Sequence, residues 1–104
     1  MTYDSSFAAL ADPTRRYLFE ALSKRPQAVG ALAETVPVSR PAVSQHLKVL
    51  TDAGLVTMRK QGRSNIYAVR REGLAELRAY LDQLWGDVLT DFANEIENPK
   101  GDIP

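Results

Sequence analysis

The segment between residues 38 and 56 carries side chains whose types and spacing suit contact with a nucleic acid. Ser39 can cap a helix whose first turn contains Pro41, where a missing backbone donor costs nothing. Three apolar residues follow at helical spacing and form one stripe: Val43, Leu47 and Leu50. Roughly opposite this stripe lie a hydroxyl, an amide and a cation: Ser44, Gln45 and Lys48. A helix that buries one face and offers such donors on the other suits the DNA major groove, where glutamine can pair with adenine.

Three neighbours of these donors are further candidate DNA contacts. Ser39 and Arg40 lie at the helix N-terminus, and Arg40 is able either to hold a phosphate or to recognise a guanine. His46 borders the apolar stripe, so we favour an imidazole that holds the helix against its neighbour or bonds a phosphate over direct base contact. Catalysis is not expected, because no nucleophile or paired carboxylate accompanies this lone histidine.

A second group of candidate DNA contacts surrounds a glycine turn at residues 61–63. Its cations and neutral donors suit phosphate or minor-groove contact, and the alternative is a solvated hairpin rim: Arg59, Lys60, Arg63, Ser64 and Asn65. Tyr67 is expected to pack against the protein, with its hydroxyl free to reach a phosphate.

Positive charge surrounds both groups, although the formal net charge of the 104-residue chain is zero. Residues 1–70 carry ten Lys or Arg against five Asp or Glu, whereas residues 71–104 carry three against eight. Between residues 40 and 70 there are six basic residues and one acidic residue, Asp52. A polyanion is therefore expected to bind the basic half, and the acidic half is expected to do something else.

The pattern of the chain predicts the elements that position these residues. Helices are expected at 4–11, from 13 to about 24, at 28–36, at 41–53 and from 72 to about 97. Asp12 followed by Pro13 is a helix start, and Gly54 ends the helix that carries the donors. Residues 55–59 and 65–69 are predicted strands, with Gly62-Arg63 at the tip of their hairpin. A hairpin beside a helix-turn-helix makes a mainly α winged helix-turn-helix, in one domain at 1–97 with a flexible tail at 98–104.

The predicted C-terminal helix has more apolar surface than one small domain can cover. We expect it to form a homodimer interface together with the first helix, through these residues: Tyr3, Phe7, Leu10, Leu77, Leu81, Leu84, Trp85, Val88, Leu89 and Phe92. Trp85 and Phe92 could instead line a ligand pocket, but aromatic residues at helical spacing usually pack.

Composition excludes several classes of protein. The chain has no cysteine and one histidine, so neither a transition-metal site nor a thiol switch is expected, and no cofactor is predicted. It has no glycine-rich phosphate loop and no paired acid and base, which argues against an enzyme. No apolar run is long enough to span a bilayer, and the N-terminus lacks the pattern of a secretory signal. These features favour a cytoplasmic protein with no membrane partner.

In the order and spacing of its motifs, the chain resembles the ArsR (arsenical-resistance repressor) family of bacterial transcription regulators. The matching strings are Ala-Asp-Pro-Thr-Arg-Arg at 11–16, the segment 38–50, Asp-Ala-Gly-Leu-Val at 52–56, and Gly62-Arg63 with Tyr67. The resemblance implies a homodimeric winged helix that pairs through its first and last helices, docks its fourth helix in the major groove of double-stranded DNA and represses transcription. Because a two-fold dimer presents two identical recognition helices, we expect a palindromic operator. Metal-sensing members of the family carry Cys-x-Cys on the third helix or histidine-rich pairs on the last, and this chain has neither.

A protein-interaction module that uses the winged-helix fold is the main alternative function. The basic helix and hairpin argue against it, because a module of that kind needs no polyanion surface. Whether a small organic effector or a partner protein regulates the chain remains open.

Overall fold

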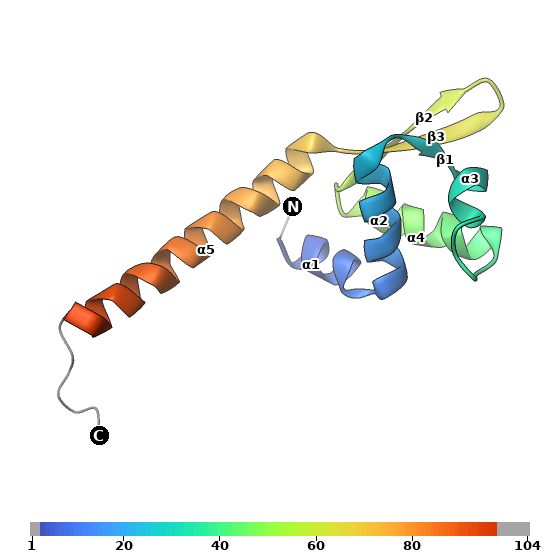
Figure 1. Ribbon diagram of the computed structural model, residues 1–104. Helices are drawn as coiled ribbons and strands as arrows, with labels where there is room; N and C mark the ends of the chain where they lie inside the picture. Colours follow the sequence, from blue (N-terminus) through green and yellow to red (C-terminus); the bar gives the residue numbers. More distant parts are fainter. Residues whose placement is uncertain (1–2, 98–104) are drawn as a thin grey trace. The chain divides into compact units, whose positions relative to one another are not determined.

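The computed structural model describes residues 3–97 of the chain (Figure 1). The elements follow in the order α1 (Tyr3–Ala11), α2 (Pro13–Lys24), β1 (Gln27–Ala28), α3 (Val29–Ala33), α4 (Arg40–Asp52), β2 (Val56–Gln61), β3 (Ser64–Val69) and α5 (Arg71–Glu97). The backbone divides into two compact units, Met1–Leu74 and Ala75–Pro104. The first unit holds the winged helix-turn-helix, and the second consists of most of α5. The tail at 98–104, predicted to be flexible, lies outside the described residues.

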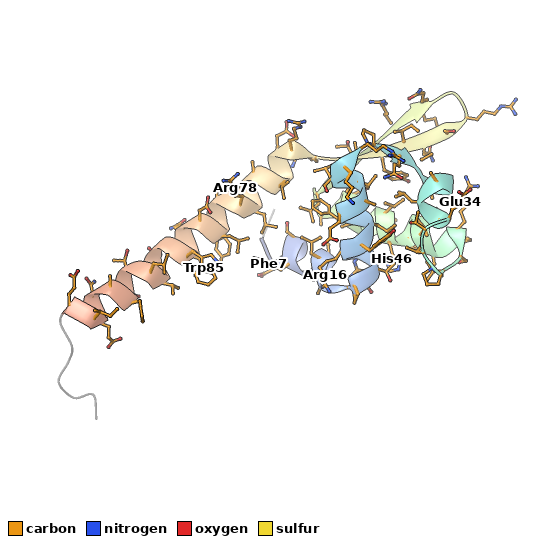
Figure 2. The ribbon with its side chains drawn as sticks, viewed as in Figure 1. Phe7, Arg16, Glu34, His46, Arg78 and Trp85 are labelled. Atoms are coloured by element: carbon orange, nitrogen blue, oxygen red, sulfur yellow. The ribbon has the colours of Figure 1, made fainter. Side chains whose placement is uncertain are left out.

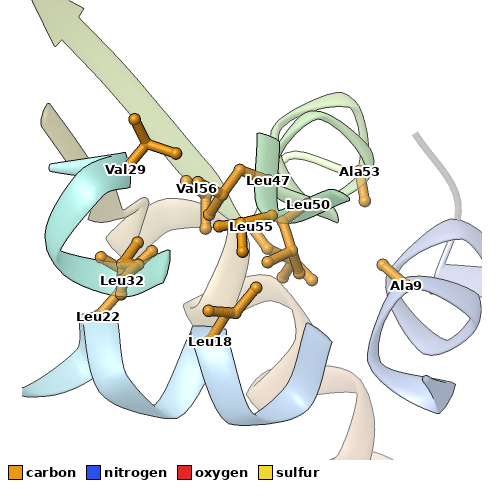
Figure 3. Packing of buried hydrophobic residues seen from close by; sticks show 11 residues of the cluster. Ala9, Leu18, Leu22, Val29, Leu32, Leu47, Leu50, Ala53, Leu55 and Val56 are labelled. Atoms are coloured by element: carbon orange, nitrogen blue, oxygen red, sulfur yellow. The ribbon is translucent and has the colours of Figure 1, made fainter. Parts of the chain in front are cut away.

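The core of the first unit forms where α2, α3 and α4 bring their apolar faces together (Figure 3). Leu18 and Leu22 come from α2, Leu32 comes from α3, and all three are almost fully buried. The predicted stripe of α4 (Val43, Leu47 and Leu50) is completely buried. Burial of a leucine or valine side chain contributes about 1.5–3 kcal/mol. This stripe therefore fixes the rotation of α4 about its own axis.

Side-chain caps set the N-termini of α2 and α4, as the sequence predicts. The carboxylate of Asp12 accepts hydrogen bonds from the backbone N–H groups of Thr14 and Arg15, at 2.8 and 3.1 Å. The Ser39 hydroxyl accepts one from the backbone N–H of Ala42 at 3.2 Å. Each helix has proline within its first two positions. Both starts therefore follow from local sequence alone.

The hairpin is part of a three-stranded antiparallel sheet in the order β1-β3-β2, and β1 was not expected. In β1, Gln27 pairs with Tyr67 and Ala28 pairs with Ile66. Because two-stranded ribbons are marginal in water, β1 braces the hairpin along its other edge. The predicted third helix at 28–36 is shorter than expected, since its first residue belongs to β1 and it ends at Ala33.

The end of α4, the end of β3 and the start of α5 meet at Gly54. Its φ of +78° is a left-handed conformation that favours glycine. The Gly54 carbonyl accepts a hydrogen bond from the Arg70 guanidinium at 3.2 Å, and the Arg70 N–H donates to the Leu55 carbonyl at 2.8 Å. A Cβ at Gly73 would clash with the Gly54 carbonyl. This junction ties the exit of the hairpin to the end of α4, and Arg70 is therefore a structural cation.

The Asp12 cap gives a test of the α2 start. The hydrogen bond from the Arg15 N–H lowers the pKa of Asp12 below the usual 3.8; burial opposes this, and the Thr14 N–H and the charges of Arg15 and His46 reinforce it. Because the folded-state pKa is depressed, the stability from this charge is complete above the unfolded value and is lost as pH falls through the folded value.

We therefore expect Asp12→Ala to lower the urea midpoint at pH 7. Asp12→Asn should keep most of the stability, because asparagine also caps helices. A carboxyl titration followed by NMR should have its midpoint below 3.8. Equal midpoints in urea for Asp12→Ala and the unsubstituted protein would show that the cap does not stabilise the fold.

Candidate nucleic-acid interface

The face of α4 opposite the buried stripe is open to solvent. Ser44, Gln45 and Lys48 are all exposed on it, in agreement with the predicted periodicity. A hydroxyl, an amide and an ammonium thus project from a helix whose other side is fixed in the core. These groups can donate to base edges or phosphates, and the amide and the hydroxyl can also accept.

A groove of about 530 Å³ separates this face of α4 from the hairpin. Its lining joins residues from both: Pro41, Ser44, Gln45, Lys48, Thr51, Asp52, Met58 and Tyr67. Tyr67 is partly buried and packs against the core, as predicted. Met58, which pairs with Tyr67 across the hairpin, is 44% exposed and was not among the predicted site residues. The sequence did not identify Met58 as a site residue, because the strand register decides which side chains of the hairpin line the groove.

The strand register divides the predicted hairpin contacts between two faces of the sheet. Lys60 pairs with Asn65, and both alternate onto the face that Met58 and Tyr67 turn toward the groove. Arg59 and Ser64 alternate onto the opposite face, where the Arg59 guanidinium donates to the Gln61 side chain at 3.5 Å. Arg63 lies exposed in the turn between the strands. The structure therefore brings Lys60, Asn65 and Tyr67 to the α4 side, and does not bring Arg59 and Ser64 there.

At the start of α4, Arg40 is exposed, and its side chain extends toward α3. Its guanidinium lies close to Gly30 on α3, where an added Cβ would be 3.6 Å from the guanidinium carbon. The Ser39 hydroxyl serves as the helix cap described above. Both residues keep a predicted DNA role, and each also has a contact within the chain.

His46 lies on another side of α4, toward the start of α2 (Figure 2). It is half-buried, and its charge is close enough to Asp12 to lower the pKa of that carboxyl. This position favours the interpretation in which the imidazole holds α4 against its neighbour. A role in base contact stays a prediction.

Two further cations, Arg15 and Arg16, form hydrogen bonds within the chain. The Arg15 guanidinium donates to the carbonyls of Ala9 and Ala8 at 2.7 and 3.2 Å. The Arg16 guanidinium donates to the carbonyls of Leu10 and Ala11 at 2.9 and 3.0 Å. These four carbonyls belong to the last turn of α1, which lacks intrahelical donors. Arg15 and Arg16 thus cap α1 from α2.

Within residues 3–97, no group of three or more His, Asp or Glu side chains is placed to hold a metal ion. None of the helices in that range is long and apolar enough to cross a membrane.

Taken together, the buried helix-turn-helix, the braced hairpin and the exposed polar face of α4 define a winged-helix DNA-binding protein. A family model described as a helix-turn-helix domain matches residues 10–59. Over 99 residues the chain is 50% identical to the HTH-type transcriptional regulator Rv2034 of Mycobacterium tuberculosis, covering 95% of this chain and 92% of the relative.

Solved structures agree with this class. The ArsR-like transcriptional regulator from Rhodococcus sp. RHA1 is 33% identical, with a TM-score of 0.77, covering 89% of this chain and 90% of that one. The homodimeric winged helix-turn-helix domain Mb0332 of Mycobacterium bovis is 26% identical, with a TM-score of 0.67, covering 84% and 81%. The chain belongs to the ArsR family of winged-helix regulators, and it is a DNA-binding transcriptional regulator, not an enzyme.

Two alanine variants separate the two predicted kinds of DNA contact. Gln45→Ala should cost about 1–3 kcal/mol at a specific site and leave non-specific binding nearly unchanged, because an amide recognises base edges. Arg63→Ala should weaken binding to all sequences alike and reduce the salt slope by about one unit, because it loses a phosphate contact. Fluorescence anisotropy with specific and scrambled duplexes at several salt concentrations measures both effects.

Gln83→Ala is the matched control, since Gln83 is an exposed glutamine on the acidic helix α5. It should change neither quantity. If Gln45→Ala weakened all duplexes equally and Arg63→Ala altered sequence preference, the base-reading and phosphate-binding surfaces would be the reverse of those assigned above.

Proposed function

We propose that the protein is a homodimeric repressor that binds a palindromic operator through two copies of the α4 face and the hairpin. The observation that carries this proposal is the pairing of a fully buried stripe on α4 with an exposed face of Ser44, Gln45 and Lys48. The proposed surface adds Ser39 and Arg40 at the helix start and the hairpin residues Lys60, Arg63, Asn65 and Tyr67. Arg59 and Ser64 would contact DNA from the outer face of the hairpin.

The charge distribution supports this choice of surface. Residues 40–70 include six basic residues and one acidic residue, whereas α5 has seven acidic residues and two basic ones. Phosphates are therefore attracted to α4 and the hairpin and repelled from α5. Binding of this kind should weaken as salt rises, because each neutralised phosphate releases counterions.

The apolar side of α5 supports dimerisation. Six large apolar side chains on this helix are between 45% and 62% exposed: Leu84, Trp85, Val88, Leu89, Phe92 and Ile96. A row of this size is costly to leave in water. The occupant that we propose is the α5 of a second copy, since the related Mycobacterium bovis domain is homodimeric. Leu81, which is partly buried, would extend the same row, whereas Leu77 is only 5% exposed in the single chain, so its apolar surface is already covered.

The contribution of α1 to the dimer is less uniform than the sequence suggests. Phe7 is 40% exposed, which is compatible with an interface role. Leu10, in contrast, is partly buried and packs against the core of its own unit, so that its apolar surface is already in use. The side chain of Tyr3 lies outside the described residues.

A two-fold dimer presents two identical α4 helices and so favours an operator with two related half-sites, about one or a few helical turns apart. The second helix then binds at high effective concentration once the first is bound. Occupancy of a promoter by such a dimer blocks other proteins from the same DNA, which is repression. Because this activity requires the chromosome, we propose a cytoplasmic location. We propose no metal effector, because the family's metal ligands are absent from the sequence.

Leu89→Asp tests the proposed dimer. Leu89 is 59% exposed in the single chain, so the substitution should leave the fold intact and place an unpaired carboxylate in the interface. We expect sedimentation to show monomers and operator affinity to fall by about two orders of magnitude or more, with every DNA-facing residue unchanged.

Asn94→Asp adds the same charge to another side of α5 and should leave the dimer and its affinity unchanged. Circular dichroism verifies the helix content of both variants. A Leu89→Asp protein that remained dimeric, or that bound the operator equally well as a monomer, would contradict the proposed role of α5.

A further inference from the structure

Met58 carries the one sulfur atom within residues 3–97, since the sequence has no cysteine and its other methionine is Met1. It lies on β2, is 44% exposed, and lines the groove between α4 and the hairpin. Its partner across the hairpin, Tyr67, lines the same groove, and Lys48 lies on the α4 side. A thioether open to solvent is therefore part of the proposed DNA surface.

The thioether of Met58 suits the apolar parts of DNA. Methionine is flexible and polarisable, so it adapts to irregular apolar surfaces. Thymine methyl groups and deoxyribose carbons offer such surfaces beside the base edges and the phosphates. Apart from the buried Val56, the other residues of β2 are polar or charged. Met58 is therefore the apolar contact that this strand can offer, and DNA bound across the groove would cover it.

We propose that Met58 is a modification site at which peroxides oxidise the thioether to a sulfoxide and thereby weaken DNA binding. This inference rests on the proposed function and adds a redox control to its DNA surface. The sulfur attacks one oxygen of the peroxide, so that an S–O bond forms as the O–O bond breaks. The sulfur loses two electrons and the peroxide gains them. With hydrogen peroxide, the proton of the transferred hydroxyl joins the departing hydroxide, which leaves as water.

The sulfoxide replaces an apolar contact with a polar one. Its oxygen carries partial negative charge and accepts hydrogen bonds, so it opposes an approaching phosphate. It can also accept from Lys60, which lies two residues along the same face of the strand, and so compete with phosphate for that donor. Placing the oxygen against a thymine methyl group costs free energy, because the oxygen loses its water. Oxidation therefore lowers the affinity for DNA.

The test treats the full chain with hydrogen peroxide and follows the mass increase of one oxygen at Met58 by peptide mapping. Fluorescence anisotropy with a duplex selected by the protein from a random pool compares each oxidised protein with its own untreated sample. Affinity of the unsubstituted protein should fall about threefold to tenfold, because 44% of the methionine side chain is open to that contact. Methionine sulfoxide reductases for both epimers should restore the affinity.

Two variants locate the effect. Met58→Leu keeps an apolar side chain without a thioether, so peroxide should not alter the affinity of this variant. The matched control combines Met58→Leu with Gln83→Met and so places the thioether at an exposed position on α5. The control should gain an oxygen at position 83 and keep the affinity of its untreated sample. Saturating duplex should slow oxidation at Met58 in the unsubstituted protein and leave oxidation at position 83 in the control unchanged.

The other outcomes overturn the inference. It fails alone if Met58 is fully oxidised and the affinity is unchanged, or if saturating duplex does not slow that oxidation. An equal loss of affinity in peroxide-treated Met58→Leu, or a loss that the reductases do not reverse, would assign the effect to damage elsewhere. If the untreated protein binds neither selected nor random duplexes, the proposed function fails and the inference fails with it.

Discussion

Burial of one side of α4 is the constraint on which the rest of the structure depends. Val43, Leu47 and Leu50 are fully buried, and together they contribute several kcal/mol to folding. A helix held in this way cannot rotate without exposing them. The polar residues on its other side therefore project from the helix in one fixed direction.

The remaining elements hold the hairpin in a fixed place beside that face. The Gly54 junction ties the end of β3 to the end of α4, and β1 pairs with the outer edge of β3. As Figure 1 shows, the hairpin extends beyond the helices that support its base. Its cations therefore lie away from the core and in contact with water. Because they stay hydrated, their charge carries little desolvation penalty. These cations can therefore attract anions without lowering the stability of the folded core.

Local signals in the sequence predicted more of the fold than of the site. The caps at Asp12 and Ser39 and the apolar stripe of α4 depend on near neighbours, and all are found. The strand β1 was missed because two residues have no periodicity and pair with a partner far along the chain. The division of hairpin residues between two faces, and the groove position of Met58, also depend on register. The local pattern of a single sequence does not indicate which distant segments pair with one another.

The claim that the exposed side of α4 and the hairpin form the DNA surface is tested most directly by NMR. Backbone amide shifts would be recorded as a duplex selected by the protein from a random pool is titrated into the full chain. Our account predicts that the largest changes occur at Ser44, Gln45 and Lys48 and around Arg63, and that residues 84–96 of α5 stay unchanged. Large changes along α5, with the amides of α4 unaffected, would contradict it.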